Sequence, residues 1–326
     1  MTMTTQLLTE SPPPGPGVYP GVPMHEYAKW PYLNGSLLAC AYLPDGTVSM
    51  KHLRAYEQGR LVKESADLLL GRAIHTRLLE PHLFATQFAV AGPCNGILKS
   101  GPSKGQTCGK PGAASLEGCW FCWQHAPAGA EPPDNLLSEA EAAACEELAA
   151  NIGKHKVVKL FKAHGGVEVS FVWDQPVAYT VGGAEKETTI RVKGRVDKDL
   201  PEPHGIPPTI VDLKTTHLGH HTPFWFARQV HEYCYDLKAA IYVDGLERLT
   251  GVRREFFWIV VEKTCPYDVN AVRADEETLE VGRARYNDIL SRYAACQETG
   301  EWPGVNENWE WGGLPAWKRR KGKGSL

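Results

Sequence analysis

The sequence TIVDLKTT places an acid, Asp212, and a base, Lys214, two positions apart in a run of β-branched residues. Side chains alternate between the two faces of a strand, so these two share one face and Leu213 occupies the other. Most such pairs are solvated ion pairs on an exposed face. The neighbours Ile210 and Val211 instead favour a buried strand, where a carboxylate and an ammonium must be paired, bound to metal or shifted in pKa.

Two further carboxylates lie in the strand patterns that precede this one, Glu168 in GVEVSFVW and Asp197 at the end of the next. Adjacent strands could bring Asp197 and Asp212 together, with Glu168 as a third acidic ligand. Converging carboxylates repel each other, and a hard divalent cation is the usual reason to tolerate that. We therefore expect one or two Mg²⁺ ions, with Mn²⁺ as an alternative. His75 could be a further ligand, although a lone histidine on an apolar helix is more often a hydrogen-bonded core residue.

The chemistry that such a site would support is phosphodiester hydrolysis. Beside a metal ion, Lys214 could orient a water molecule, or accept its proton if its own pKa is depressed. Two ions several ångströms apart would stabilise the attacking and the leaving oxygens of an in-line displacement.

A second cluster of metal-binding residue types combines four of the nine cysteines with one histidine. In a chain without an export signal, clustered cysteines more often hold metal than form disulfides. Tetrahedral Zn²⁺ takes thiolate and imidazole ligands, so one of the five candidates is spare. The candidates are Cys94, Cys108, Cys119, Cys122 and His125.

The elements that must position these residues follow from apolar periodicity and from turn residues. Residues 50–80 predict one or two helices, broken around Gly59 and stopped by Pro81, with His75 on the second. A capping box, Ser138 with Glu141, predicts a helix start. Helices are expected over 50–80, 138–152, 223–249 and 276–299, and strands over 166–173, 188–200, 209–216 and 254–263.

Composition shifts predict the domain organisation. We expect a flexible Pro/Gly-rich leader at residues 1–29, a main domain at 30–317, and a basic tail at 318–326. Residues 92–133 are rich in Gly, Pro and Cys and lack apolar periodicity, which favours a small insertion folded around metal.

Bulk properties limit the partners. A net charge of -3 and a pI near 6.5 mean that any nucleic-acid site must be local. No stretch approaches the roughly twenty apolar residues of a membrane span, and the first residues do not have the pattern of a signal peptide. We therefore expect a cytoplasmic protein with no membrane partner.

Several motifs in order resemble the exonuclease VIII (RecE) family, in the RecB-type and phage-exonuclease branch of the PD-(D/E)xK nuclease superfamily. The resemblance spans roughly residues 30–317 and implies an α/β fold, a restriction-endonuclease-like core with a mixed central sheet flanked by helices. The motifs are LGRAIHTRLLEP, GVEVSFVW, KGRVD, IVDLKTT, YDLKAAIY and FFWIVVEKTCPYDV, with GEWPG and LPAW near the end.

The resemblance also implies a function. It implies a Mg²⁺-dependent 5′-to-3′ exonuclease that acts on the ends of linear double-stranded DNA as a ring-shaped homo-oligomer. Such an enzyme would produce single strands for an annealing protein in phage-type recombination, in a bacterial host. The implied metal ligands are His75, Glu168, Asp197, Asp212 and the backbone carbonyl of Leu213, and Lys214 is the implied catalytic lysine.

Two features qualify the resemblance, a basic residue and a Gln-x-x-x-Tyr motif. Arg195 lies where the family has a basic residue near the acidic cluster, although a strand-surface charge is an equal alternative. The family's Gln-x-x-x-Tyr motif becomes Lys238-x-x-x-Tyr242 here, while Gln229 and Tyr233 repeat its spacing in another helical phase. Tyr242 stays a candidate for supporting the site and the DNA, and the role of Lys238 stays open.

The cysteine segment resembles a small phage-type zinc knuckle with a closing Cys-x-x-His, which favours Cys94, Cys108, Cys122 and His125 and leaves Cys119 as the alternative ligand. Some RecB-type nucleases carry an iron–sulfur cluster, but its cysteines come from both ends of the nuclease domain. For the whole chain, the alternatives to an exonuclease are an endonuclease, a single-strand nuclease, or a non-catalytic DNA- or protein-binding module of the same fold.

Overall fold

A mixed sheet forms the centre of the computed structural model, which describes residues 13–61, 66–156, 160, 162–202, 205 and 207–305. The strand order is β1–β6–β7–β8–β9–β10, and all neighbours pair antiparallel except β8 and β9, which are parallel. This is the mixed α/β sheet that the sequence predicted. The strands are β1 (Gly17–Tyr19), β6 (Gly166–Val181), β7 (Ala184–Leu200), β8 (Thr209–Thr216), β9 (Glu255–Glu262) and β10 (Val269–Arg273).

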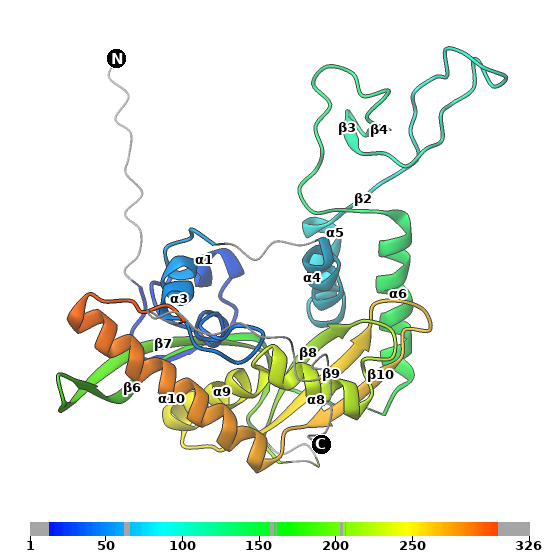
Figure 1. Cartoon of the computed structure of the whole chain (residues 1–326). Helices are drawn as coiled ribbons and strands as arrows, with labels where there is room; N and C mark the ends of the chain where they lie inside the picture. Colours follow the sequence, from blue (N-terminus) through cyan, green and yellow to red (C-terminus); the bar gives the residue numbers. More distant parts are fainter. Residues whose placement is uncertain are drawn as a thin grey trace, which may run out of the picture.

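Two apolar clusters cover the two faces of the sheet. Ile210 belongs to one cluster and its neighbour Val211 to the other, because β8 is buried on both faces, as is typical of a strand with a parallel neighbour. The first cluster includes residues of α2 (Gly35–Ala39), α3 (Met50–Glu57), α9 (Tyr235–Thr250) and α10 (Glu276–Thr299). The second includes residues of α4 (Ala66–Leu79) and α6 (Glu139–Lys154), which lie together in Figure 1.

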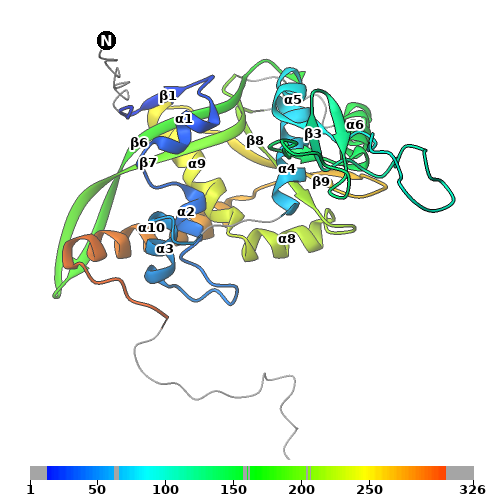
Figure 2. The same ribbon diagram turned by 90° about the horizontal axis from the view of Figure 1, so that it is seen from above.

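Strands β6 and β7 form a long hairpin that reaches beyond the rest of the sheet (Figure 2). Gly182 and Gly183 connect them with φ values of +59° and +80°. A two-residue turn with both φ angles positive matches the twist of a hairpin and favours glycine at both positions. The predicted strands 166–173 and 188–200 are therefore too short at the hairpin end, where exposed polar residues hide the strand pattern.

Three other predictions need correction. The predicted helix 223–249 is two helices, α8 (Pro223–Glu232) and α9, because Cys234 adopts a left-handed φ of +52°. The predicted flexible leader contains β1 and α1 (Met24–Lys29), where Tyr27 packs edge-on against Trp30 at 5.3 Å between ring centroids. A further helix, α5 (Pro81–Gln87), begins at Pro81, the residue at which helical structure was expected to stop.

For two helices the predicted starting residues are confirmed. Helix α6 has the predicted capping box, with Ser138 and Glu141 bonding reciprocally. The predicted helix 276–299 is α10, which begins where Asp275 accepts a hydrogen bond from the Thr278 N–H at 2.8 Å. Within the described ranges, no helix is both long and apolar enough to cross a membrane. The predicted basic tail, residues 318–326, lies outside the described residues.

The cysteine-rich segment forms a separate lobe at the opposite end of the molecule from the β6–β7 hairpin (Figures 1 and 2). Its base is the parallel pair β2 (Ala89–Val90) and β5 (Leu136–Leu137), and a hairpin of β3 (Ala114–Leu116) and β4 (Cys119–Phe121) lies within it. The predicted insertion 92–133 falls between β2 and β5. We refer to residues 92–133 as the insertion lobe.

Candidate active site

Three of the predicted ligands converge where α4 crosses the sheet. His75 from α4, Glu168 from β6 and Asp197 from β7 each offer one ligand atom, and these atoms lie within 4.8 Å of one another. The β6–β7 register places Glu168 opposite Asp197, between the pairs Val167–Lys198 and Val169–Val196. Glu168 has a left-handed φ of +50°, an unusual backbone conformation within a strand that sets the direction of its side chain.

The electrostatics of this group are those of closely spaced, buried acidic side chains. Burial, followed by repulsion from Asp212, raises the pKa of Asp197 to about 7. Burial and the charge of Asp197 also raise the pKa of Glu168. Burial, assisted by Lys214, lowers the pKa of His75, so its imidazole is neutral and able to bind metal. Two carboxylates and one imidazole fit a divalent cation such as Mg²⁺ or Mn²⁺.

Asp212 and Lys214 lie beside this group as an ion pair, Lys214 Nζ with Asp212 Oδ2. Burial alone would lower the pKa of Lys214, but the carboxylates of Asp212 and Asp197 raise it above the usual value. Lys214 is therefore a protonated donor in this arrangement, which favours the predicted role of orienting a water molecule over that of accepting a proton.

The backbone at Leu213 connects the two parts of the site. Its N–H donates to Asp197 Oδ2 at 2.6 Å, and its carbonyl oxygen accepts a hydrogen bond from Lys214 Nζ at 3.4 Å. The structure thus places Leu213 against both the acidic group and the lysine, and its predicted role as a carbonyl ligand stays a prediction.

Arg195 holds Glu168 in place. Its Nε donates to Glu168 Oε2 at 2.6 Å, and its Nη1 donates to Ser170 Oγ at 2.9 Å and to the carbonyl oxygen of Val22 at 2.6 Å. Ser170 is directly opposite Arg195 in the hairpin, so the guanidinium reaches Glu168 diagonally. The Arg195 side chain is 11% exposed. The alternative of a solvated strand-surface charge therefore does not describe this residue.

Removing the Arg195 guanidinium is expected to weaken the site without removing a ligand. We predict that Arg195→Met lowers Mg²⁺ affinity or activity about 10- to 100-fold, the range typical of groups that support metal ligands. Arg191→Met is the matched control, because Arg191 lies on the same strand and pairs with the half-exposed Asp174. Calorimetric titration with Mg²⁺ compares the two variants, and equal affinities would contradict the role of Arg195.

The residues around the predicted Gln-x-x-x-Tyr position lie near the Asp212–Lys214 pair. Tyr242 is buried, with its ring 5.9 Å from that of Phe171. Lys238 Nζ and Lys214 Nζ lie 5.4 Å and 5.1 Å from the ring centroid of Tyr235. Tyr235 was not among the predicted residues, and its only sequence signal was its position at the start of the YDLKAAIY motif.

Gln229, the alternative glutamine, contacts the end of β8. Its Nε2 donates to the side-chain oxygen of Thr216 at 2.9 Å. Thr216 ends β8, two residues after Lys214. The structure therefore gives Gln229 a contact with the strand that carries the site, although it lies on α8 and not on the helix with Tyr242.

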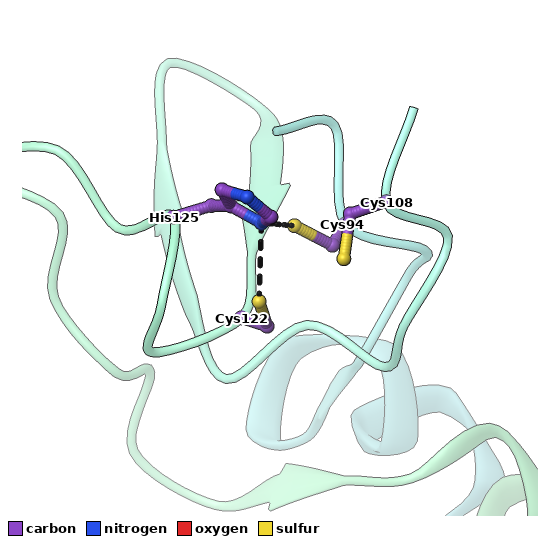
Figure 3. Close-up of side chains that lie close together, drawn as sticks. All are labelled: Cys94, Cys108, Cys122 and His125. Carbon is purple, nitrogen blue, oxygen red and sulfur yellow. Dashed lines mark hydrogen bonds between the residues drawn. The ribbon is translucent and has the colours of Figure 1, made fainter. Parts of the chain in front are cut away.

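The insertion lobe brings together the favoured set of metal ligands. Cys94, Cys108, Cys122 and His125 place their ligand atoms within 4.8 Å of one another. His125 Nδ1 lies 3.6 Å from Cys94 Sγ and 3.4 Å from Cys122 Sγ (Figure 3). Cys119 is exposed and is not in this group.

This cluster suits a tetrahedral metal. Burial raises the pKa of Cys94, but hydrogen bonds from the Cys122 and Gly96 backbone and from His125 outweigh it and lower the pKa to about 7. Thiolates are the form that binds metal. Three sulfur ligands and one imidazole form a donor set typical of structural zinc.

The base of the insertion lobe is hydrogen-bonded to the helix that carries His75. Arg72 on α4 donates from Nη2 to Asn135 Oδ1 at 2.7 Å, and Asn135 Nδ2 donates to the carbonyl oxygen of Gln87 at 3.1 Å. The base of the lobe therefore contacts α4 one helical turn from the candidate metal ligand.

Comparisons with known proteins show the family and the fold of the chain. Residues 45–311 match the model of a family described as PDDEXK-like domain of unknown function (DUF3799). No curated protein matches the chain. Among solved structures, the chain is similar to a candidate exonuclease from Eubacterium rectale, with 15% sequence identity, a TM-score of 0.52, and coverage of 87% of this chain and 89% of the other. At this identity the likeness shows the fold alone. The family match covers most of the sequence, so the chain belongs to the DUF3799 family of PDDEXK-like domains, within the PD-(D/E)xK nuclease superfamily.

Proposed function

We propose that this protein is a Mg²⁺-dependent exodeoxyribonuclease that degrades linear double-stranded DNA from its ends in the 5′-to-3′ direction. The observation that carries the proposal is the convergence of His75, Glu168 and Asp197 beside the Asp212–Lys214 pair. Membership of the PDDEXK-like family supports the nuclease chemistry. The sequence resemblance to the exonuclease VIII family, and the neighbour described as a candidate exonuclease, support action at ends.

The side chains divide the chemistry between them. A divalent cation held by His75, Glu168 and Asp197 would supply Lewis acidity toward the phosphoryl group. Lys214, protonated and fixed by Asp212, donates a hydrogen bond that orients the attacking water and offsets negative charge as it develops. The Leu213 N–H keeps Asp197 aligned. Arg195 limits the motion of Glu168.

Digestion of end-labelled duplex DNA tests the proposed direction. Linear DNA carrying a label at either its 5′ or its 3′ ends is incubated with the protein and Mg²⁺. The proposal expects 5′ label to be released first as short products, while 3′ label persists in a longer single strand. Earlier release of the 3′ label would contradict the direction, and cutting inside both labelled strands would favour an endonuclease.

We also propose the biological setting that the family resemblance implies. The single strands produced would be substrates for an annealing protein in phage-type recombination in the bacterial cytoplasm, and the enzyme would act as a ring-shaped homo-oligomer around the duplex. A ring around the duplex explains how an enzyme stays on one DNA molecule. Light scattering checks this point, because a monomer at working concentrations would remove the basis for threading.

Zinc is the proposed occupant of the insertion lobe. We predict that the purified protein contains one zinc ion, that Cys108→Ser loses it, and that Cys119→Ser retains it, because Cys119 lies outside the ligand group. Structural zinc contributes directly to folding, so metal loss should expose residues 92–133 to protease. Elemental analysis and limited proteolysis measure both effects. Iron in place of zinc, or metal loss in Cys119→Ser, would contradict the assignment.

A further inference from the structure

A cleft opens at the end of the strand that carries Lys214. It has a volume of about 190 Å³ and is lined by Thr215 and Thr216 of β8, by the segment after that strand, and by α8. Tyr235 forms part of its wall. The ring centroid of Tyr235 lies 5.1 Å from Lys214 Nζ, so one wall of the cleft is next to the candidate active site.

Exposed aromatic rings lie in and beside this cleft. Tyr233 is 51% exposed and Trp225 is 40% exposed, and both line it, while the adjacent Phe224 is 70% exposed. The Tyr233 and Tyr235 ring centroids are 5.6 Å apart. A row of rings therefore leads from the catalytic lysine to the surface. Large aromatic side chains exposed together mark binding sites more often than chance.

The cleft also carries positive charge. Arg228 places its guanidinium carbon 4.8 Å from the ring centroid of Trp225, and the His220 ring stacks on Trp225 at 5.1 Å. Lys263 also lines the cleft, and Glu232 is the single acidic residue among the lining residues. Cations beside aromatic platforms are the combination that binds unpaired nucleotides, with the cation near the phosphate and the base on the ring.

We propose that this cleft binds the single-stranded end of DNA next to the scissile phosphate, with a base stacked on Tyr233 and the backbone near Arg228. The cleft is far too small to admit a duplex, and only unpaired bases offer free faces for stacking. The inference rests on the proposed function, since it assigns a subsite to the same active site. It adds that the strand must be unpaired for at least one nucleotide beside the point of cleavage.

Binding without hydrolysis tests this subsite. Fluorescein-labelled oligothymidylate is titrated with Asp212→Asn protein, and fluorescence anisotropy gives the dissociation constant. A second probe has the same length but abasic residues. Tyr233→Ala in this background is expected to weaken oligothymidylate binding at least about fivefold, the lower end of what one stacked base contributes. Tyr233→Phe keeps the ring and is expected to bind like the parent.

The probes and controls separate stacking from other causes. The Asp212→Asn parent protein should bind the abasic probe weakly. Tyr233→Ala should weaken that binding no further, because the abasic probe has no base to stack on the Tyr233 ring. Trp123→Ala is the control, since Trp123 is a 68% exposed tryptophan in the insertion lobe. Thermal unfolding confirms that each variant folds. Unchanged oligothymidylate binding by Tyr233→Ala, or equal loss in Trp123→Ala, would overturn the proposal.

A parallel digestion of duplex DNA by protein with Asp212 intact separates this inference from the proposed function. If oligothymidylate binding depends on the Tyr233 aromatic ring but no DNA is digested, the proposed subsite stands and the proposed nuclease activity is refuted. If the DNA is digested but oligothymidylate binding does not depend on the Tyr233 aromatic ring, the nuclease activity stands and the proposed subsite is refuted.

Discussion

Replacing Lys214 with alanine is expected to reduce hydrolysis of linear duplex DNA about 10²- to 10⁴-fold, the range typical of one positioned proton donor or acceptor. The side chain is 17% exposed and is paired with Asp212, and its raised pKa keeps it charged at neutral pH. The variant loses both the donor that orients water and the charge that balances the carboxylates. Initial rates of nucleotide release with excess Mg²⁺ measure the effect.

Lys186→Ala is the matched control for this variant. Lys186 also pairs with a carboxylate, Glu298, but it lies near the tip of the β6–β7 hairpin, away from the site. Its removal should leave the rate unchanged. Because Lys214→Ala leaves a buried carboxylate without its partner, circular dichroism must confirm that the variant folds. A folded Lys214→Ala variant with more than about a tenth of the wild-type rate would contradict its catalytic role.

Replacing Asp197 with asparagine is expected to abolish the response to metal and to have opposite effects on stability with and without Mg²⁺. Hydrolysis should fall at least about 100-fold, since a ligand matters more than the groups that support it. Wild-type protein should gain about 2.7 kcal/mol of unfolding free energy when Mg²⁺ is a hundredfold above its dissociation constant, and the variant much less.

In EDTA the difference in stability between the asparagine variant and wild type should depend on pH. The folded-state pKa of Asp197 is raised to about 7, above the unfolded value, so its favourable contribution is present at low pH and is lost as the pH rises through about 7. At pH 8 the asparagine variant should be more stable by about 1–3 kcal/mol, and the difference should vanish near pH 4. Denaturant unfolding at both pH values checks this. A variant less stable than wild type at pH 8 would contradict the claim that burial and repulsion from Asp212 disfavour the charged form of Asp197.

Strand β8, which carries Asp212 and Lys214, could be predicted from sequence because its pattern is local. Period-two alternation places Asp212 and Lys214 on one face, and the apolar neighbours predict burial, which the structure bears out. Helix α10 could be predicted for the same reason, since its capping residue and its closing glycine lie within its own segment. The fold of the PD-(D/E)xK superfamily was predicted from several such local motifs, taken together in their order along the chain.

Other parts of the site depend on contacts between distant segments. The approach of Arg195 to Glu168 needs the hairpin register, which the Gly182–Gly183 turn fixes far from both residues. The left-handed backbone at Glu168 leaves no mark in the sequence, since glutamate has no preference for that conformation. For the insertion lobe, the resemblance to a zinc knuckle favoured Cys108 over Cys119, but residue types and spacing alone left five candidates for four places; the fold exposes Cys119 and groups Cys108 with His125.

The break between α8 and α9 was missed for a related reason. Apolar periodicity continues through Tyr233 and Cys234, so the pattern predicts one helix, while tertiary packing buries Cys234 in a left-handed conformation. This break turns α8 away from α9 and places Tyr233 at the cleft. The residues that the proposed DNA subsite uses were therefore hidden until the fold was known.

Digestion of linear and covalently closed duplex DNA side by side tests the central claim most directly. Wild type and Lys214→Ala are each incubated with both DNAs, in Mg²⁺ and in EDTA. Loss of the linear DNA alone, only with wild type and only in Mg²⁺, is the result we predict. Cutting of the closed circle would contradict an enzyme that needs ends, and no loss of either DNA by wild type in Mg²⁺ would contradict a nuclease at this site.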